Sequence, residues 1–150
     1  MMRRLLPMIS LAAVAAIGFG LACTTSSTPP LERIAVRSGW ARIADSGATS
    51  GAYLEIVNND TTGVTLVAVT SEVARAAEVH ETMQHDGMAH MMARAELPIA
   101  AGEILSMQPG GLHVMLVDLR RALVVGDSVP LRLRFRDGTE IPVVVPVKTP

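Results

Sequence analysis

Short segments in which apolar and polar residues alternate recur along the chain from about residue 34 onward. Residues 129–136 show this pattern most clearly. Apolar residues occupy the odd positions and arginines three of the even ones: Val129, Leu131, Leu133 and Phe135 against Arg132, Arg134 and Arg136. A period of two places these two sets on opposite faces of a β-strand. We therefore expect the apolar set to face a core.

Turn signals separate seven further segments of this kind, for example Asn-Asn-Asp at residues 58–60 and Pro-Gly-Gly at residues 109–111. The predicted strands are residues 34–44, 52–57, 64–69, 77–83, 88–95, 112–117, 129–136 and 141–147. No segment shows a convincing amphipathic helix, although residues 71–77 are expected to form a connector with one helical turn. Seven to nine strands predict an all-β fold, a Greek-key sandwich or barrel.

Three details of this fold can be anticipated. Trp40 is expected to anchor the core within the first strand. Asp137-Gly138 is a favoured two-residue turn and predicts a hairpin between the last two strands. Pro142 and Pro146 lie in the final strand and predict that it runs along an edge of the sheet, because proline cannot donate a backbone hydrogen bond.

The first 22 residues have the features of a secretory signal peptide. Arg3 and Arg4 form a basic start, and the apolar stretch at residues 11–22 is short for a transmembrane helix. The next residue, Cys23, is the only cysteine, and residues 19–23 (FGLAC) resemble a bacterial lipobox, which is cleaved before a cysteine that becomes lipidated. Gly20 departs from the leucine usual at that position, and an ordinary signal peptide with an incidental cysteine is the alternative.

These features predict a signal peptide at residues 1–22, a lipid-anchored tether at 23–31 and one domain at 32–150. The expected location is extracytoplasmic, in the periplasm or at the cell surface of a bacterium. Loss of the leader removes Arg3 and Arg4, which leaves 11 basic and 14 acidic residues and argues against nucleic-acid binding. With Cys23 lipidated, the domain has no thiol for a disulfide or for nucleophilic catalysis.

The candidate chemistry is concentrated in one window. All four histidines and all six methionines beyond the leader lie between His80 and Met115, where random scatter would place roughly three of the ten. Within it, four residues follow the spacing His80-x10-Met91-x21-His113-x-Met115. Imidazole and thioether are soft ligands that suit Cu(I) and suit Mg²⁺ or Ca²⁺ poorly. Both are neutral, which favours release of the ion over permanent storage.

A two-residue turn at Asp86-Gly87 would fix how this window folds. Residues whose numbers sum to 173 would then face each other, so His80 opposes Ala93 and Thr82 opposes Met91. His80 and Met91 become diagonal neighbours on one face. His113 and Met115 share a face of a later strand because they are two residues apart. A hairpin and a strand can thus present His80, Met91, His113 and Met115 to one copper ion.

The same register places a second group of soft ligands on the other face of the hairpin. Its members, beside Glu81, are Met83, His85, Met88, His90 and Met92. They could form a second metal site, and the two imidazoles would let it take Cu(II) as well. Methionine is also a common filler of cores, and histidines near a hairpin tip are often only solvated. For Met107 alone a core position is expected.

The ligand spacing resembles the signature of the copper chaperone PCu(A)C family. The flanking segments are similar too: residues 79–82 (VHET), 109–116 (PGGLHVML), 126–131 (GDSVPL), 40–42 (WAR) and 51–53 (GAY). The resemblance covers residues 33–147. One departure is that Met91 is followed by Met92, where the family often has a basic residue. Met91 keeps the spacing and the hairpin face and is the expected ligand.

The resemblance implies a cupredoxin-like β-fold that binds Cu(I) outside the cytoplasm through His80, Met91, His113 and Met115. It also implies delivery of copper to the binuclear copper centre of cytochrome c oxidase, directly or through a second copper chaperone. Copper scavenging or resistance by a periplasmic lipoprotein is the alternative role. A structural lipoprotein without metal would leave the clustering of histidine and methionine unexplained.

Enzymatic functions are disfavoured by the motifs. Glu81 is followed by Thr82, Met83 and Gln84, so the His-Glu-x-x-His motif of zinc hydrolases is absent from the sequence. No motif around a nucleophilic serine or cysteine is present either, and we expect no enzyme. A blue-copper electron carrier requires a cysteine thiolate, whereas Cys23 belongs to the predicted tether.

Overall fold

The computed structural model describes residues 33–85 and 87–149. The predicted signal peptide, Cys23, the tether and Asp86 lie outside these residues. The described strands are β1 (Ile34–Arg42), β2 (Ser50–Asn58), β3 (Val64–Thr70), β4 (Ala74–His85), β5 (Met88–Ala93), β6 (Leu97–Ile99), β7 (Ile104–Ser106), β8 (Leu112–Leu119), β9 (Ser128–Phe135) and β10 (Glu140–Lys148). Within this part of the chain, no helix has the length and apolar character needed to cross a bilayer.

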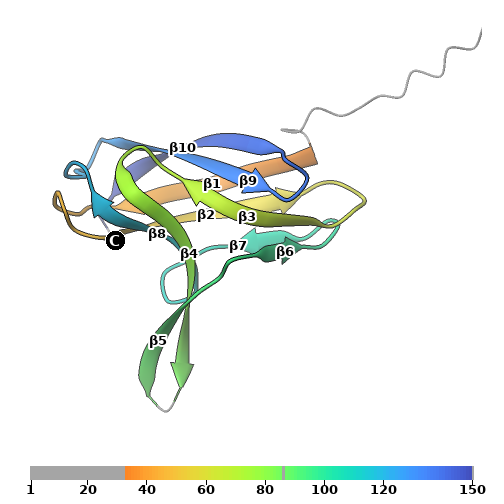
Figure 1. Ribbon diagram of the computed structural model, residues 1–150, viewed down its shortest axis with the longest axis horizontal. Coiled ribbons are helices and arrows are strands. Elements are labelled where there is room, and N and C mark those ends of the chain that lie inside the picture. Colours follow the sequence, from red (N-terminus) through yellow and green to blue (C-terminus); the bar gives the residue numbers. More distant parts are fainter. Residues whose placement is uncertain (1–32, 86, 150) are drawn as a thin grey trace, which may run out of the picture.

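The strands pair in the order β5-β4-β8-β2-β1-β10-β9-β3-β6, and β7 pairs with β2. All of these pairs are antiparallel except β1 with β10, which are joined in parallel over only two residue pairs, Ala41 with Val147 and Arg42 with Lys148. This short join lets the sheet fold over, so that β5-β4-β8-β2-β1 and β10-β9-β3-β6 form the two layers of a sandwich (Figure 1). The predicted all-β class is confirmed.

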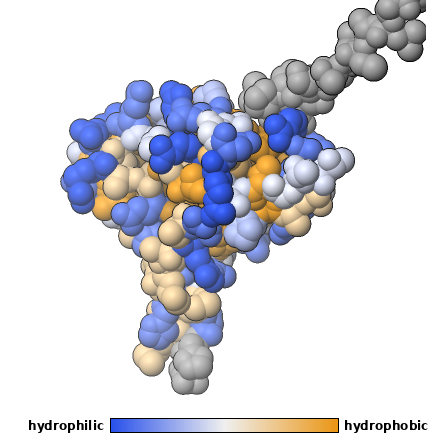
Figure 2. Space-filling view, turned by 45° about the vertical axis from the view of Figure 1, so that its right-hand side comes forward, coloured by the Kyte–Doolittle hydropathy of each residue, from blue (hydrophilic) through white to orange (hydrophobic). Residues whose placement is uncertain are grey.

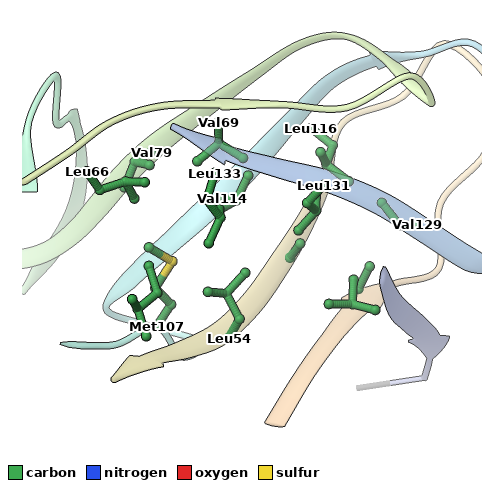
Figure 3. Close-up of a cluster of buried hydrophobic side chains, with 14 of the residues drawn as sticks. Leu54, Leu66, Val69, Val79, Met107, Val114, Leu116, Val129, Leu131 and Leu133 are labelled. Carbon is green, nitrogen blue, oxygen red and sulfur yellow. The ribbon is translucent and has the colours of Figure 1, made fainter. Parts of the chain in front are cut away.

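The core lies between the layers and follows the alternation of the sequence (Figure 3). In β9 the odd positions are buried and the even positions exposed, as predicted. They pack against side chains of the other layer, among them Leu54 of β2, Val79 of β4 and Val114 of β8. Met107 is only 3% exposed and confirms its expected place in the core.

Two predictions about the strands are wrong. Residues 74–77, expected in a connector with a helical turn, are the start of β4. The final strand β10 is not at an edge, because it lies between β9 and β1. Pro142 and Pro146 are tolerated there because both fall outside the two-residue ladder with β1.

The three-residue strands β6 and β7 were not predicted, since three residues are too few to establish a period.

Trp40 is half-buried and is not part of the core, contrary to expectation. Ile34 is buried, so simple alternation would also turn residue 40 inward. The register between β1 and β2 shifts between Arg37 and Trp40, and Ser38 has a positive φ of 51°. This β-bulge reverses the alternation. Ala41 faces the core in its place, with no exposed surface.

The hairpin of β4 and β5 extends away from the sandwich (Figure 1). Strand β4 pairs with β8 only as far as Glu81 opposite Leu112, followed by a hydrogen bond from Thr82 N to Gly111 O. Beyond this point its ladder partner is β5 alone, the first strand in the sheet order. We call residues 82–85 and 87–92 the arm. All six residues of β5 are exposed, so the arm has two solvent-facing sides.

Candidate metal centre

His80 of β4 and His113 of β8 face each other across the antiparallel ladder. Their neighbours Val79 and Val114 also form a pair and point into the core, so the two imidazoles lie on the outer face of the sheet. The ring centroids are 6.2 Å apart. Two nitrogen donors from adjacent strands therefore stand side by side outside the core.

Met115 and Met91 lie on the same outer face. Met115 is two residues beyond His113 on β8 and opposes Glu78. Strand β5 pairs Thr82 with Met91 and His80 with Ala93, so the register expected from a two-residue turn is confirmed. Gly87, the second residue of that turn, has a φ of 76°, the conformation such turns require. The sheet thus brings His80, Met91, His113 and Met115 to one face, as the spacing predicted.

The four side chains differ in exposure along this face. His113 is 8% exposed and Met91 is 63% exposed, while His80 and Met115 are half-buried. The difference arises because β8 is covered by neighbours on both sides, whereas β5 is the edge strand of the arm. A metal ion held by all four would be anchored on the imidazole side and accessible at Met91.

Hydrogen bonds indicate which ring nitrogen of each histidine can accept a metal. His113 Nδ1 is 3.0 Å from the carbonyl oxygen of Gly111. A carbonyl can only accept, so Nδ1 carries the proton and the lone pair of the neutral ring is on Nε2. His80 Nε2 is 3.0 Å from Glu78 Oε2, and His80 Nδ1 is buried without a hydrogen-bond partner among the described residues. In neutral His80 the available lone pair is therefore on Nδ1.

Glu78 was not anticipated from the sequence. Its carboxylate bonds His80 and shares the outer face with Met115, its partner in the ladder. Histidines that ligate metals commonly donate their second N–H to a carboxylate or carbonyl, which fixes the ring. The period of two between Glu78 and His80 was the signal that could have revealed it. Glu78 is thus a candidate for orienting His80.

A row of aromatic rings continues from the histidines across the sheet. Tyr53 lies between His113 and Trp40, with ring centroids 6.4 Å from His113 and 4.6 Å from Trp40. Gly51, the partner of Met115 in the ladder, leaves space for this ring, because a Cβ there would lie 2.8 Å from the Tyr53 hydroxyl oxygen. The β-bulge that turns Trp40 outward completes the row. The row forms a wall of the candidate site on the β2 side.

The second predicted group lies on the opposite face of the arm. Met83 opposes His90 and Glu81 opposes Met92. Met83, Met88 and Met92 are 40%, 61% and 48% exposed, and His90 is exposed as well. Core packing therefore does not account for these side chains. The backbone of His85 pairs with Met88, but the side chain of His85 lies outside those described.

The described residues contain no group of three or more His, Cys, Asp or Glu side chains placed to hold a metal ion. The outer-face arrangement instead combines two imidazoles with two thioethers, a softer donor set than carboxylates.

Residues 34–147 match the protein family described as "Putative lipoprotein LpqE-like". A protein of Leifsonia xyli subsp. xyli described as "Putative lipoprotein Lxx21020" is 36% identical over 116 residues, which cover 77% of this chain and 69% of that protein. The family match spans the predicted domain from its first strand to its last.

Solved structures share the fold. The copper-bound PCuAC domain from PmoF2 superposes with a TM-score of 0.65 at 24% identity, covering 79% of this chain and 94% of that domain. The solution structure of CuI-DR1885 from Deinococcus radiodurans has a TM-score of 0.60 at 30% identity, covering 77% of this chain and 79% of that one. The fold is that of the PCuAC domains, and the expected cupredoxin-like architecture is confirmed.

Proposed function

The chain belongs to the LpqE-like family, and from that premise we propose that it is an extracytoplasmic Cu(I) chaperone. One observation carries the proposal: two imidazoles with available lone pairs and two thioethers share one outer face of the sheet. The similarity to a domain described as copper-bound and to a chain described as CuI-bound supports copper as the cargo. The chain binds and hands over an ion and does no covalent chemistry.

The proposed ligands are Nδ1 of His80, Nε2 of His113 and the sulfur atoms of Met91 and Met115. Soft, neutral donors favour Cu(I) over harder divalent ions. Outside the cytoplasm thiols tend to be oxidised to disulfides, whereas thioethers are not. Met91 is exposed, so a protein that accepts copper can reach the ion on this side. Release then begins when a ligand of the acceptor replaces the Met91 thioether.

The proposed destination is the binuclear copper centre of cytochrome c oxidase, reached directly or through a second copper chaperone. The proposed organisation is a leader at residues 1–22, a tether at 23–31 lipidated at Cys23, and the copper-binding domain at 32–150. The family and the Leifsonia xyli relative are each described as a "Putative lipoprotein", which supports this anchoring. A tethered domain could meet membrane-bound acceptors without diffusing away.

The test is a competition between the protein and a chromogenic Cu(I) chelator. Met115→Leu and Met91→Leu keep an apolar side chain but remove the sulfur, so Cu(I) affinity should fall by at least about tenfold in each. Met107→Leu is the matched control, because Met107 is buried in the core, whereas the proposed ligands lie on the outer face of the sheet. Wild-type affinity in Met115→Leu would refute the ligand assignment.

A transfer assay addresses the destination. Copper-loaded protein is mixed with the soluble copper-binding domain of the oxidase subunit, and the oxidase centre is followed by its absorption. Transfer to the oxidase domain that is faster than from a small-molecule copper chelate supports delivery. If the protein binds copper tightly but transfers it neither to the oxidase domain nor to a second chaperone, delivery is contradicted and copper scavenging is favoured.

A further inference from the structure

We propose that the arm carries a second, weaker Cu(I) site made by Met83, Met88, His90 and Met92, on the face opposite the primary site. Binding at this site goes beyond the proposed function. Its use as an entry point for the primary site rests on that function. The four residues belong to the described part of the arm, and their register is set by β4 and β5.

Exposure is the first observation that calls for an explanation. Three methionines on one face are 40% to 61% exposed, although methionine belongs to the residues most often buried. These methionines lie on the face of the hairpin that continues the inward face of β4 beyond Val79. The arm extends past the sandwich, however, and meets no opposing layer there (Figures 1 and 2). Figure 2 shows the resulting apolar colouring along the projecting hairpin. These side chains do not stabilise the core.

The register places the donors within reach of one ion. Met83 and His90 are directly opposed, a relation that brings Cβ atoms to about 4.5–5.5 Å. Met92 and Met88 lie two residues to either side of His90 on β5, about 7–8 Å from Met83 along the diagonals and within reach of long side chains. An imidazole with two or three thioethers can surround Cu(I) from one side of the hairpin. Exposure to solvent keeps such a site weak.

The same face disfavours harder ions. Glu81, the nearest carboxylate in the register, is bonded by Arg94 through both Nε, at 2.7 Å from Oε2, and Nη2. Its negative charge is therefore already paired. One imidazole and three thioethers remain, a set that suits Cu(I) better than Cu(II) or Zn²⁺. Cu(II) binding would need further nitrogen or oxygen donors.

The sheet order provides a path between the two sites. Strand β5 is an edge strand of the sheet, and no described strand pairs with its outer edge. Met92 and Met91 are adjacent and point to opposite faces across that edge. Copper can move by ligand exchange: a bond to the Met92 sulfur breaks as one to the Met91 sulfur forms. Copper stays Cu(I), and neutral ligands exchange without proton or electron transfer.

The experiment titrates the full chain with Cu(I) under anaerobic conditions and follows the methionine methyl groups by ¹³C NMR. The methyl signals of Met91 and Met115 should shift with the first equivalent, and those of Met83, Met88 and Met92 with the second. The variant Met83→Leu/Met88→Leu/Met92→Leu should lose the second equivalent and load the first several-fold more slowly. His90→Asn should weaken the second equivalent alone.

Met91→Leu is the matched control on the same strand and should weaken the first equivalent while the second remains. Saturation of the wild-type chain at one equivalent, with no shift of the Met83, Met88 or Met92 methyl groups, would overturn the second site and leave the proposed function intact. Shifts confined to these three methyl groups would support the second site and refute the primary one. An unchanged loading rate in the triple variant would refute the entry role.

Discussion

The Oε2 atom of Glu78 lies 3.0 Å from the Nε2 atom of His80. Both side chains project from the outer face of β4, and Glu78 also faces Met115 of β8. This contact holds the proton of neutral His80 on Nε2 and leaves the lone pair on Nδ1, the proposed donor atom. Glu78 therefore orients a proposed ligand without being one.

Glu78→Gln should reduce the affinity for Cu(I). Partners that orient metal ligands typically contribute 10–100-fold to affinity. Because the Glu78 side chain is 54% exposed, we expect about tenfold, the lower end of that range. Competition with a chromogenic chelator measures the change. Glu140→Gln, which breaks an exposed ion pair with Arg132 on the other layer, is the control. Equal affinity in the two variants would contradict the orienting role of Glu78.

Gly39→Ala should destabilise the fold. A Cβ at residue 39 would lie 2.4 Å from Cγ1 of Val145, and overpacking of this kind costs about 1–3 kcal/mol. Chemical denaturation measures the loss. Val145→Ala removes the clashing methyl groups, so the double variant should lose less than the sum of the single losses. Additive losses would show that Gly39 is required for another reason.

Acid should weaken the fold partly through Asp127. Hydrogen bonds from the Val124 backbone N–H and from Arg121 lower the pKa of the Asp127 carboxyl below its usual value of 3.8. A lowered folded-state pKa contributes stability above the usual value, and this stability is lost as pH falls through the folded-state pKa. Asp127→Asn should therefore be less stable than wild type at neutral pH, and the difference should shrink below pH 3.8. Urea denaturation across this range measures it, and a difference independent of pH would contradict the assignment.

Cys23→Ser should release the protein from the membrane fraction. The serine cannot carry the thioether-linked lipid, whereas the proposed copper ligands all lie in the domain. Fractionation followed by copper analysis of the soluble form measures both properties. Copper binding should remain at the wild-type stoichiometry. Loss of copper from the soluble variant would show that the thiol itself is a ligand.

The register of the hairpin could be predicted from the sequence because it depends on local chemistry. A two-residue turn at Asp86-Gly87 allows one pairing, and that pairing is observed between His80 and Ala93 and between Thr82 and Met91. The alternation in β9 likewise depends only on the period of a strand. The common face of His80 with Met91 and that of His113 with Met115 followed from the same two rules.

The position of Trp40 could not be predicted, because a β-bulge leaves little mark on the pattern of apolar residues. The bulge between Arg37 and Trp40 reverses which residues face the core. The aromatic row from Trp40 through Tyr53 to His113 exists only because of this reversal. Glu78 could have been found from the sequence, because its spacing of two residues from His80 places both side chains on one face of β4.

The sequence by itself determined the all-β class, the strand register of the hairpin and the identity of the soft donors, because period, turn chemistry and side-chain type are local properties. Only the tertiary structure decided that β4 and β8 are neighbours, which unites His80 with His113. It also decided that the arm extends beyond the opposing layer, which leaves Met83, Met88 and Met92 in solvent. Both depend on contacts between residues far apart in the chain, and burial is a property of the assembled layers.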